Sequence, residues 1–268
     1  MDRLPEFFGG SADLTGSNLT SWEGAGSSRY LNYGVREFAM TSITNGMILH
    51  GGFRTFSGTF LVFMEYARNA VRLASLMRLP NIFVYTHDSI AVGEDGPTHQ
   101  PIEHLWSLRA IPGFAVCRPA DARETSAAWL AILRRQDPVG IVLSRQGLPV
   151  LDTDPKSVLD GVRAGGYLVR HTPEPRATIM ATGSEVHLAL QAAESLASEG
   201  LDGNVASLPC LEWFNQQEQS YRDAVIRPDV RPRVAVEAGS TIGWHRYVGD
   251  DGAIGGVDHI RASGDAYR

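Results

Sequence analysis

Residues 82–101 read IFVYTHDSIAVGEDGPTHQP and indicate the fold class of the chain around them. The apolar run Ile82–Tyr85 predicts a buried strand, and the loop after it passes through Gly93 and Gly96 before a helix expected near Pro101. A strand followed by a glycine-rich loop and a helix is typical of α/β sheets, in which ligands bind at the carboxyl ends of the strands. Two histidines and three acidic residues in this loop therefore indicate a binding or catalytic site.

Strand-like and helix-like segments alternate on both sides of this loop. In the first half, the pattern predicts a helix over Phe60–Met77, strands over Phe114–Cys117 and Gly140–Leu143, and a helix from Asp121 to Leu133 that begins with a capping box. In the second half, it predicts strands over Thr178–Ala181, Val205–Leu208 and Arg233–Val236, a helix over Glu185–Ser198 with Ser184 as its N-cap, and a helix around Gln216–Val225.

This alternation predicts an α/β protein of two domains, each a mostly parallel sheet covered by helices. We expect the first domain over residues 1–147, a proline- and aspartate-rich linker over 148–160, and a second, smaller domain over 161–268. A chain of 268 residues is long enough for two such cores.

Composition and charge exclude several classes of function. The chain is 43% hydrophobic and 20% charged, as in ordinary globular proteins, and its net charge of −6 without a lysine or arginine run argues against nucleic-acid and membrane partners. Cys117 and Cys210 lack metal or redox spacing, so we expect two buried thiols. The N-terminus does not read as a signal peptide, and no apolar run reaches membrane-spanning length, so the expected location is the cytoplasm.

Four further motifs, together with residues 86–101, resemble the transketolase family in family order. They are GGSADLT at 9–15, YGVRE at 33–37, TFLVFMEY at 59–66 and LSRQ at 143–146. The resemblance implies a thiamine-diphosphate-binding fold followed by a transketolase C-terminal domain. It also implies a transferase of the pentose phosphate pathway, which moves a two-carbon ketol unit between ketose and aldose phosphates.

Glu37 is the main catalytic candidate. An acidic residue at the start of an apolar helix commonly just complements the helix dipole. In similar enzymes, however, the matching glutamate binds a ring nitrogen of the cofactor's aminopyrimidine and promotes loss of the thiazolium C2 proton.

Phe60, Phe63 and Tyr66 are spaced three residues apart, as if on one helix face. That pattern alone is typical of core packing. The resemblance implies in addition that these aromatic rings enclose the aminopyrimidine.

His87, Asp95 and His99 are the candidate substrate residues of the glycine-rich loop. A metal site is disfavoured because a fourth ligand of fixed geometry is missing, and surface histidines are the plain alternative. In transketolases, residues matching the two histidines line the substrate channel and take part in proton transfer, and the residue matching Asp95 meets a substrate hydroxyl.

Ser17 and Arg145 resemble the family's phosphate contacts, although an isolated arginine is more often a surface charge. Asp13 resembles a residue near the cofactor and the subunit interface.

The family's diphosphate- and metal-binding motif, Gly-Asp-Gly, does not occur in this sequence. We therefore expect no metal ligand in this chain. Magnesium or calcium would be held by a separate diphosphate-binding domain, and the chain would act as a dimer or other homo-oligomer, or in a hetero-assembly with that domain. The end of the sequence, from Asp258 to Ser263, departs from the family pattern and stops before the family's final helix.

Two alternatives remain open from the sequence. One is another thiamine-diphosphate enzyme, such as a deoxyxylulose-phosphate synthase or a keto-acid dehydrogenase β subunit, although residues 86–96 match the transketolase form of the loop. The other is a truncated or non-catalytic fragment of a transketolase.

Overall fold

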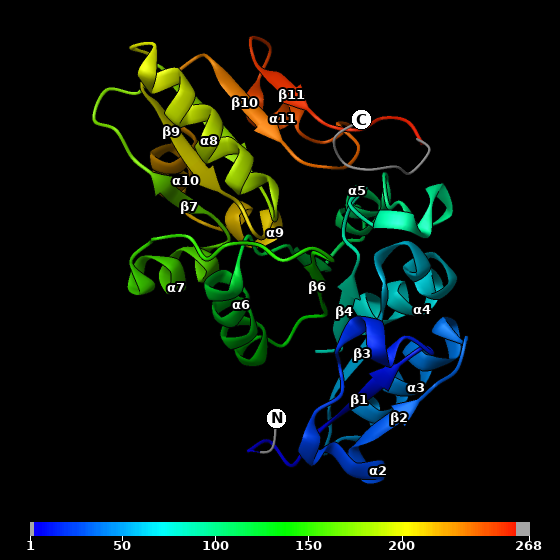
Figure 1. The fold of residues 1–268 in the computed structure, drawn as a ribbon. Coiled ribbons are helices and arrows are strands. Elements are labelled where there is room, and N and C mark those ends of the chain that lie inside the picture. Colours follow the sequence, from blue (N-terminus) through cyan, green and yellow to red (C-terminus); the bar gives the residue numbers. More distant parts are fainter. Residues whose placement is uncertain (1–2, 261–268) are drawn as a thin grey trace. The chain divides into compact units, whose positions relative to one another are not determined.

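The computed structural model describes residues 3–260, which form two compact units (Figure 1). The first unit comprises the described residues up to Ala115 together with Arg134–Arg145. The second comprises Val116–Leu133 together with the described residues from Gln146 onward. Each unit is built on its own mostly parallel sheet, which confirms the predicted α/β class with two domains. The predicted domain limits stay predictions.

Six strands build the first sheet, in the spatial order β2-β1-β3-β4-β6-β5. They are β1 (Phe7–Ser11), β2 (Tyr30–Asn32), β3 (Arg54–Phe60), β4 (Ile82–Thr86), β5 (Ala115–Cys117) and β6 (Val139–Leu143). β1 pairs in parallel with β2 and β3, and β4 pairs in parallel with β3 and β6. β3 and β4 are almost entirely buried, as expected for parallel strands with both faces covered.

The helices of this half of the chain include a tightly packed pair, α3 and α4. The α-helices are α1 (Thr15–Asn18), α2 (Gly26–Arg29), α3 (Glu37–His50), α4 (Met64–Leu76), α5 (His104–Arg109) and α6 (Ala122–Arg134). The 3-10 helices are Glu23–Ala25, Leu61–Phe63, Gly93–Asp95 and Pro97–His99.

The buried side chain of Asn81 ties α3 to the sheet. It accepts a hydrogen bond from the Thr55 hydroxyl and donates to the Thr44 hydroxyl and the Asn45 side-chain oxygen, each at 2.9 Å. Thr44 and Asn45 belong to α3, and Asn45 in turn donates to the carbonyl of Ala70 in α4 at 2.9 Å. One asparagine therefore joins a strand of the sheet to the helix pair that covers it.

Two local predictions for this half are wrong. Phe60 does not begin a helix, because it ends the buried strand β3, and a 3-10 turn separates it from α4. Its apolar character reflects burial in the sheet and not a helical face. The helix expected near Pro101 begins at His104, after the 3-10 turn Pro97–His99.

Five strands build the second sheet, in the spatial order β11-β10-β8-β9-β7, with β7 antiparallel to β9. They are β7 (Tyr167–Arg170), β8 (Ala177–Ala181), β9 (Gly203–Ser207), β10 (Arg233–Val236) and β11 (Ala253–Gly255). The helices are α7 (Pro155–Ala164), α8 (Glu185–Ser198), α9 (Leu211–Asn215), α10 (Gln219–Ile226) and α11 (His245–Val248). Both the predicted helix Glu185–Ser198 and the predicted strand Arg233–Val236 are confirmed.

Two other details of the second half differ from the sequence-based picture. The segment expected as linker contains the start of α7, which Asp154 caps by accepting a hydrogen bond from the Ser157 amide at 2.8 Å. Ser184 does not cap α8, because its hydroxyl donates to the adjacent Glu185 carboxylate at 2.6 Å.

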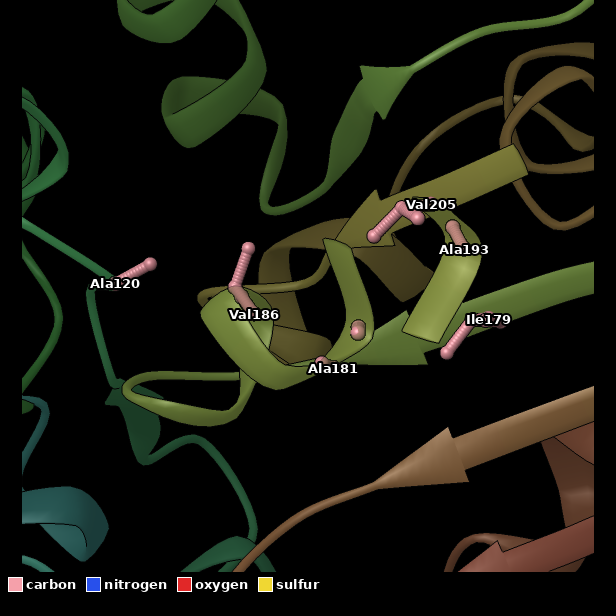
Figure 2. Close-up of a cluster of buried hydrophobic side chains, with 7 residues drawn as sticks. Ala120, Ile179, Ala181, Val186, Ala193 and Val205 are labelled. Carbon is pink, nitrogen blue, oxygen red and sulfur yellow. The ribbon is translucent and has the colours of Figure 1, made fainter. Parts of the chain in front are cut away.

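Small and β-branched side chains form the core between α8 and the second sheet (Figure 2). The cluster consists of Ala120, Ile179, Ala181, Val186, Ala189, Ala193 and Val205. Three of these residues recur at helical spacing on α8, so its amphipathic pattern is explained by this contact. Burial of a valine such as Val186 stabilises the fold by about 1.5–3 kcal/mol relative to an exposed position.

The second unit also has a charged group in its interior. The Arg118 guanidinium is fully buried and donates to the Thr182 carbonyl at 3.0 Å and to the Glu185 carboxylate. Cys117 and Cys210 are free and buried, as predicted, and burial raises the pKa of both thiols. Among the helices in residues 3–260, none has the length and apolar character needed to cross a membrane.

Candidate active site

The predicted site residues follow the carboxyl ends of parallel strands in the first sheet. Because β2, β1, β3, β4 and β6 run in the same direction, these ends share one edge of the sheet. In spatial order along this edge, Glu37 follows β2, Asp13 and Ser17 follow β1, Phe60 ends β3, His87 follows β4, and Arg145 follows β6. Segments distant in the sequence thus bring their polar residues to the edge where α/β sheets bind ligands.

Aromatic rings and both predicted histidines form one cluster at this edge. The ring of His87 stacks on Phe60 with centroids 3.6 Å apart, and Phe60 stacks on Phe63 at 5.6 Å. The rings of His99 and Phe63 meet in a T-shaped arrangement with centroids 5.1 Å apart, and the ring of Tyr66 lies 6.1 Å from that of Phe63. The structure therefore joins the predicted cofactor aromatics to the predicted substrate histidines, although Phe60 belongs to a strand and Tyr66 is exposed.

Glu37 is the first residue of α3 and is only 6% exposed. Among the residues that the structure describes, no side chain forms a hydrogen bond or ion pair with its carboxylate. Neither carboxylate oxygen is among the enclosed polar atoms that lack a partner, so the carboxylate of this otherwise buried residue is open to a polar atom from outside the described chain.

Charged and titratable groups of the loop surround His87. Its burial lowers the pKa below the ordinary histidine value, and Arg145 and His99 act in the same direction, whereas Asp95 opposes them. Neutral imidazole is therefore favoured, and this form can both donate and accept a hydrogen bond.

Arg145 lies against the loop at Gly93. A Cβ added to Gly93 would come within 3.2 Å of the guanidinium carbon, and Gly93 has a φ of +69° that disfavours other residues. The glycine therefore permits the close approach of an arginine that is otherwise exposed.

Two predicted site residues that are not glycine have left-handed backbone conformations, Asp13 with a φ of 62° and His87 with a φ of 59°. Such conformations cost free energy and cluster at functional sites. The side chains of Asp13 and Ser17 are exposed, and within residues 3–260 neither makes a hydrogen bond. These two residues lie at the same edge of the sheet as the aromatic cluster, but no hydrogen bond in the described residues holds their side chains in place.

Three buried polar residues beneath His87 were not predicted as site residues. Ser11, Asn18 and Thr86 are each less than 10% exposed and are joined by hydrogen bonds that lead to the imidazole of His87. The sequence signal is slight, since only the threonine adjoins the histidine. Ser11 lies in the separate motif at 9–15, and Asn18 lies beyond that motif.

Comparison with known proteins identifies the family. The family description "Transketolase, pyrimidine binding domain" matches residues 1–150, and "Transketolase-like TK C-terminal domain" matches residues 165–268. The transketolase of Geobacillus stearothermophilus is 51% identical over 270 residues, covering 97% of this chain and 40% of that protein. The transketolase of Mycobacterium tuberculosis is 50% identical over 289 residues, covering 98% and 41%.

Solved structures agree with these matches. The transketolase of Campylobacter jejuni has a TM-score of 0.92 and 39% identity, over 98% of this chain and 41% of that one. A Pichia stipitis transketolase solved with xylulose 5-phosphate has a TM-score of 0.91 and 43% identity, over 98% and 40%. A split-gene transketolase described as an inactive β4 tetramer has a TM-score of 0.77 and 25% identity, over 97% and 85%.

The chain spans about two fifths of the length of the curated relatives it matches. The match covers two successive domains of those relatives, in the same order as the two sheets described above. The chain therefore belongs to the transketolase family, of which it represents the pyrimidine-binding and C-terminal portion.

Proposed function

We propose that this chain supplies the pyrimidine half of a transketolase active site. With a diphosphate-binding domain, it would transfer a two-carbon ketol unit between ketose and aldose phosphates in the pentose phosphate pathway of the cytoplasm. The observation that carries this proposal is Glu37, a largely buried residue whose carboxylate has no partner within residues 3–260 and which lies on the sheet edge that also bears the aromatic cluster.

The residues present fit the aminopyrimidine of thiamine diphosphate. That cofactor, when bound, supplies the carbanion chemistry of the reaction. Phe60 and Phe63 provide flat apolar faces for a heteroaromatic ring, and the exposed Tyr66 extends this surface. Glu37 would hold or release a proton at a ring nitrogen, which accounts for a carboxylate left without a partner on an otherwise buried residue.

The loop residues would bind the sugar phosphate. His87 and His99 would form hydrogen bonds with hydroxyl and carbonyl oxygens of the sugar, because a neutral imidazole carries an N–H donor beside an acceptor nitrogen. Asp95 is exposed and would accept a hydrogen bond from a substrate hydroxyl. Arg145 and Ser17 would bind the phosphate, for which a forked guanidinium is well suited. Asp13 would lie near the cofactor and the neighbouring subunit.

A diphosphate-binding partner is supported by the exposed apolar surface of α3 and α4. These two helices pack against each other, and each leaves large apolar side chains in solvent. The exposed residues are Phe38, Ile43 and Leu49 on α3, and Tyr66, Leu73 and Leu76 on α4. A surface of this kind is typical of protein–protein interfaces. The partner domain would also hold the magnesium or calcium ion, and the assembly would be a dimer or a related oligomer.

The non-catalytic fragment is the second candidate, because a similar chain of a split-gene transketolase is described as an inactive β4 tetramer. Ketol transfer from xylulose 5-phosphate to ribose 5-phosphate separates the two candidates. The assay contains thiamine diphosphate and magnesium, with this chain alone or with a separately produced diphosphate-binding domain of a related transketolase. Transfer only in the mixture supports the proposal. If this chain is folded by circular dichroism and associates stably with the diphosphate-binding domain, but the mixture transfers no ketol unit, the result supports the non-catalytic candidate.

A further inference from the structure

We propose that Ser11, Asn18 and Thr86 form a one-directional chain of hydrogen bonds that holds His87 in the tautomer protonated on Nε2. They would act as positioning residues, because none of them needs to touch the substrate. The meaning of this tautomer for catalysis rests on the proposed function, whereas the hydrogen-bond chain itself does not.

The series of hydrogen bonds begins at the carboxyl end of β1. The backbone amide of Leu14 donates to the Ser11 hydroxyl at 3.3 Å, and that hydroxyl donates to Oδ1 of Asn18 at 2.8 Å. The atom of Asn18 that faces this hydroxyl is Oδ1, and because an amide oxygen can only accept, the serine hydroxyl is the donor. Its Nδ2 group must then point the other way.

The next hydrogen bond, from Asn18 to Thr86 at the end of β4, has the same donor-to-acceptor direction. Nδ2 of Asn18 lies 2.6 Å from the Thr86 hydroxyl oxygen, and because an amide nitrogen can only donate, the threonine oxygen accepts. The Thr86 hydroxyl hydrogen is thereby free to point to Nδ1 of His87, 3.0 Å away. Nδ1 is then the acceptor of that bond and carries no proton, so the proton of the neutral ring lies on Nε2.

Burial makes this direction difficult to reverse. Ser11 is 0% exposed, Asn18 is 5% exposed and Thr86 is 6% exposed, so bulk water is largely kept from replacing a broken hydrogen bond. If His87 were protonated on Nδ1 instead, the Thr86 hydroxyl hydrogen would lose its acceptor in a buried position. We expect the Nε2-protonated tautomer to exceed the other by at least about tenfold.

The series of hydrogen bonds is possible because α1 crosses the sheet. Ser11 and Thr86 end strands that β3 separates, and α1 contacts both β3 and β4. Gly58 of β3 allows this approach, since a Cβ there would come within 2.9 Å of the Thr20 methyl group just beyond α1. Asn18, the last residue of α1, thereby reaches from the end of β1 to the end of β4.

The consequence is a fixed donor in the sugar-phosphate site. Stacking on Phe60 holds the plane of the His87 ring, and Thr86 occupies Nδ1, so the N–H at Nε2 is the group left for substrate. We infer that His87 meets an acceptor oxygen of the sugar, such as a carbonyl oxygen, as a hydrogen-bond donor.

Nitrogen-15 NMR of the full chain, with labelled histidine, tests this inference without any activity. His87 is assigned from the signals missing in His87→Gln. In wild-type chain at a pH where His87 is neutral, we expect a pyridine-like shift at Nδ1 and a pyrrole-like shift at Nε2. Thr86→Ser, which keeps the hydroxyl, should preserve this pattern. Thr86→Val, which removes it, should shift the tautomer ratio by at least about tenfold.

Asn18→Asp provides the sharper variant. The new carboxylate can only accept, so the Thr86 hydroxyl would donate to it and accept from Nδ1 of His87, which would invert the tautomer. A wild-type ring protonated on Nδ1 would overturn the inference, and so would an unchanged tautomer in folded Asn18→Asp and Thr86→Val chains. None of these readouts depends on ketol transfer. The experiments can therefore refute the proposed function without refuting the hydrogen-bond inference, and they can refute the inference without refuting the function.

Discussion

The imidazole of His87 stacks on the phenyl ring of Phe60 at a centroid distance of 3.6 Å and an interplanar angle of 24°. Phe60 ends β3 and His87 follows β4, so the stack joins the ends of two neighbouring parallel strands. The same phenyl ring stacks on Phe63 at 5.6 Å. Phe60 therefore links the aromatic group proposed for the cofactor to the histidine proposed for the substrate.

His87 should titrate below the ordinary histidine pKa of about 6.5. Burial is the main cause, with Arg145 and His99 acting in the same direction and Asp95 opposing them. Proton NMR of the His87 ring, compared with His87→Gln for assignment, measures the pKa directly. A midpoint at or above the ordinary value would contradict the description of this ring as buried and neutral.

The same shift predicts a pH dependence of stability. Between the lowered folded-state pKa and about 6.5, the unfolded chain binds a proton at His87 that the folded chain does not. The contribution of His87 to the free energy of unfolding is therefore largest above pH 6.5 and decreases as the pH falls through that window. Urea unfolding of wild type and His87→Gln across this range should show a smaller decrease in the variant. Parallel pH profiles would argue against the shift.

Phe63→Ala should weaken cofactor binding in the assembled enzyme more than it weakens the fold. Phe63 is half-buried and contacts Phe60, Tyr66 and His99, so its removal opens the aromatic cluster. We expect the KM for thiamine diphosphate to rise by about tenfold.

The matched control is Phe53→Ala. Phe53 lies just before the amino end of β3, is 42% exposed and packs against Phe8 at 6.1 Å. Its truncation should leave the KM for the cofactor within about twofold of wild type. An equal effect of the two variants would show that the loss of an aromatic ring acts through general stability and not through the cluster.

Arg118→Met should strongly destabilise the second unit. The variant leaves the nearly buried Glu185 carboxylate without the guanidinium that pairs with it, which costs about 3–5 kcal/mol of the free energy of unfolding. Lys156→Ala is the exposed counterpart, because Lys156 and Asp160 pair at 3.3 Å on the surface of α7, and its removal should cost less than about 1 kcal/mol. Urea unfolding followed by circular dichroism measures both. Similar costs for the two variants would contradict the buried character of the Arg118 pair.

The sequence predicts the central elements of the second half, such as α8 and β10, but not β7, β11, α7, α9 or α11. The helix Glu185–Ser198 has apolar residues at helical spacing with Gly200 just beyond its end, and Arg233–Val236 contains three consecutive apolar residues without proline. β1 and β3 carry weaker signals. Phe7–Ser11 and Arg54–Phe60 contain glycine and hydroxyl residues, which normally indicate loops but here allow segments such as Ala12–Thr20 to pass close to the sheet.

The residues of the candidate site also differ in how well the sequence predicts them. Glu37, His87, His99 and Arg145 stand out in the sequence because their chemistry is conspicuous in motifs of recognisable order. Ser11, Asn18 and Thr86 do not, because ordinary polar residues acquire their role only through the direction of their hydrogen bonds, one of which joins Asn18 to Thr86 across 68 residues of sequence. The pairing of Phe60 with His87 likewise depends on the register of β3 and β4.

The most direct test of the central claim is the rate of ketol transfer by the mixture of this chain and a diphosphate-binding domain, compared for wild type, Glu37→Gln and Glu199→Gln. Glu199 is an exposed glutamate at the end of α8 and serves as the matched control. We predict that Glu37→Gln lowers the rate by at least about 100-fold while the chain keeps its fold, and that Glu199→Gln leaves the rate within about twofold of wild type. A Glu37→Gln mixture that transfers the ketol unit at the wild-type rate would contradict the proposed role of this carboxylate in the active site.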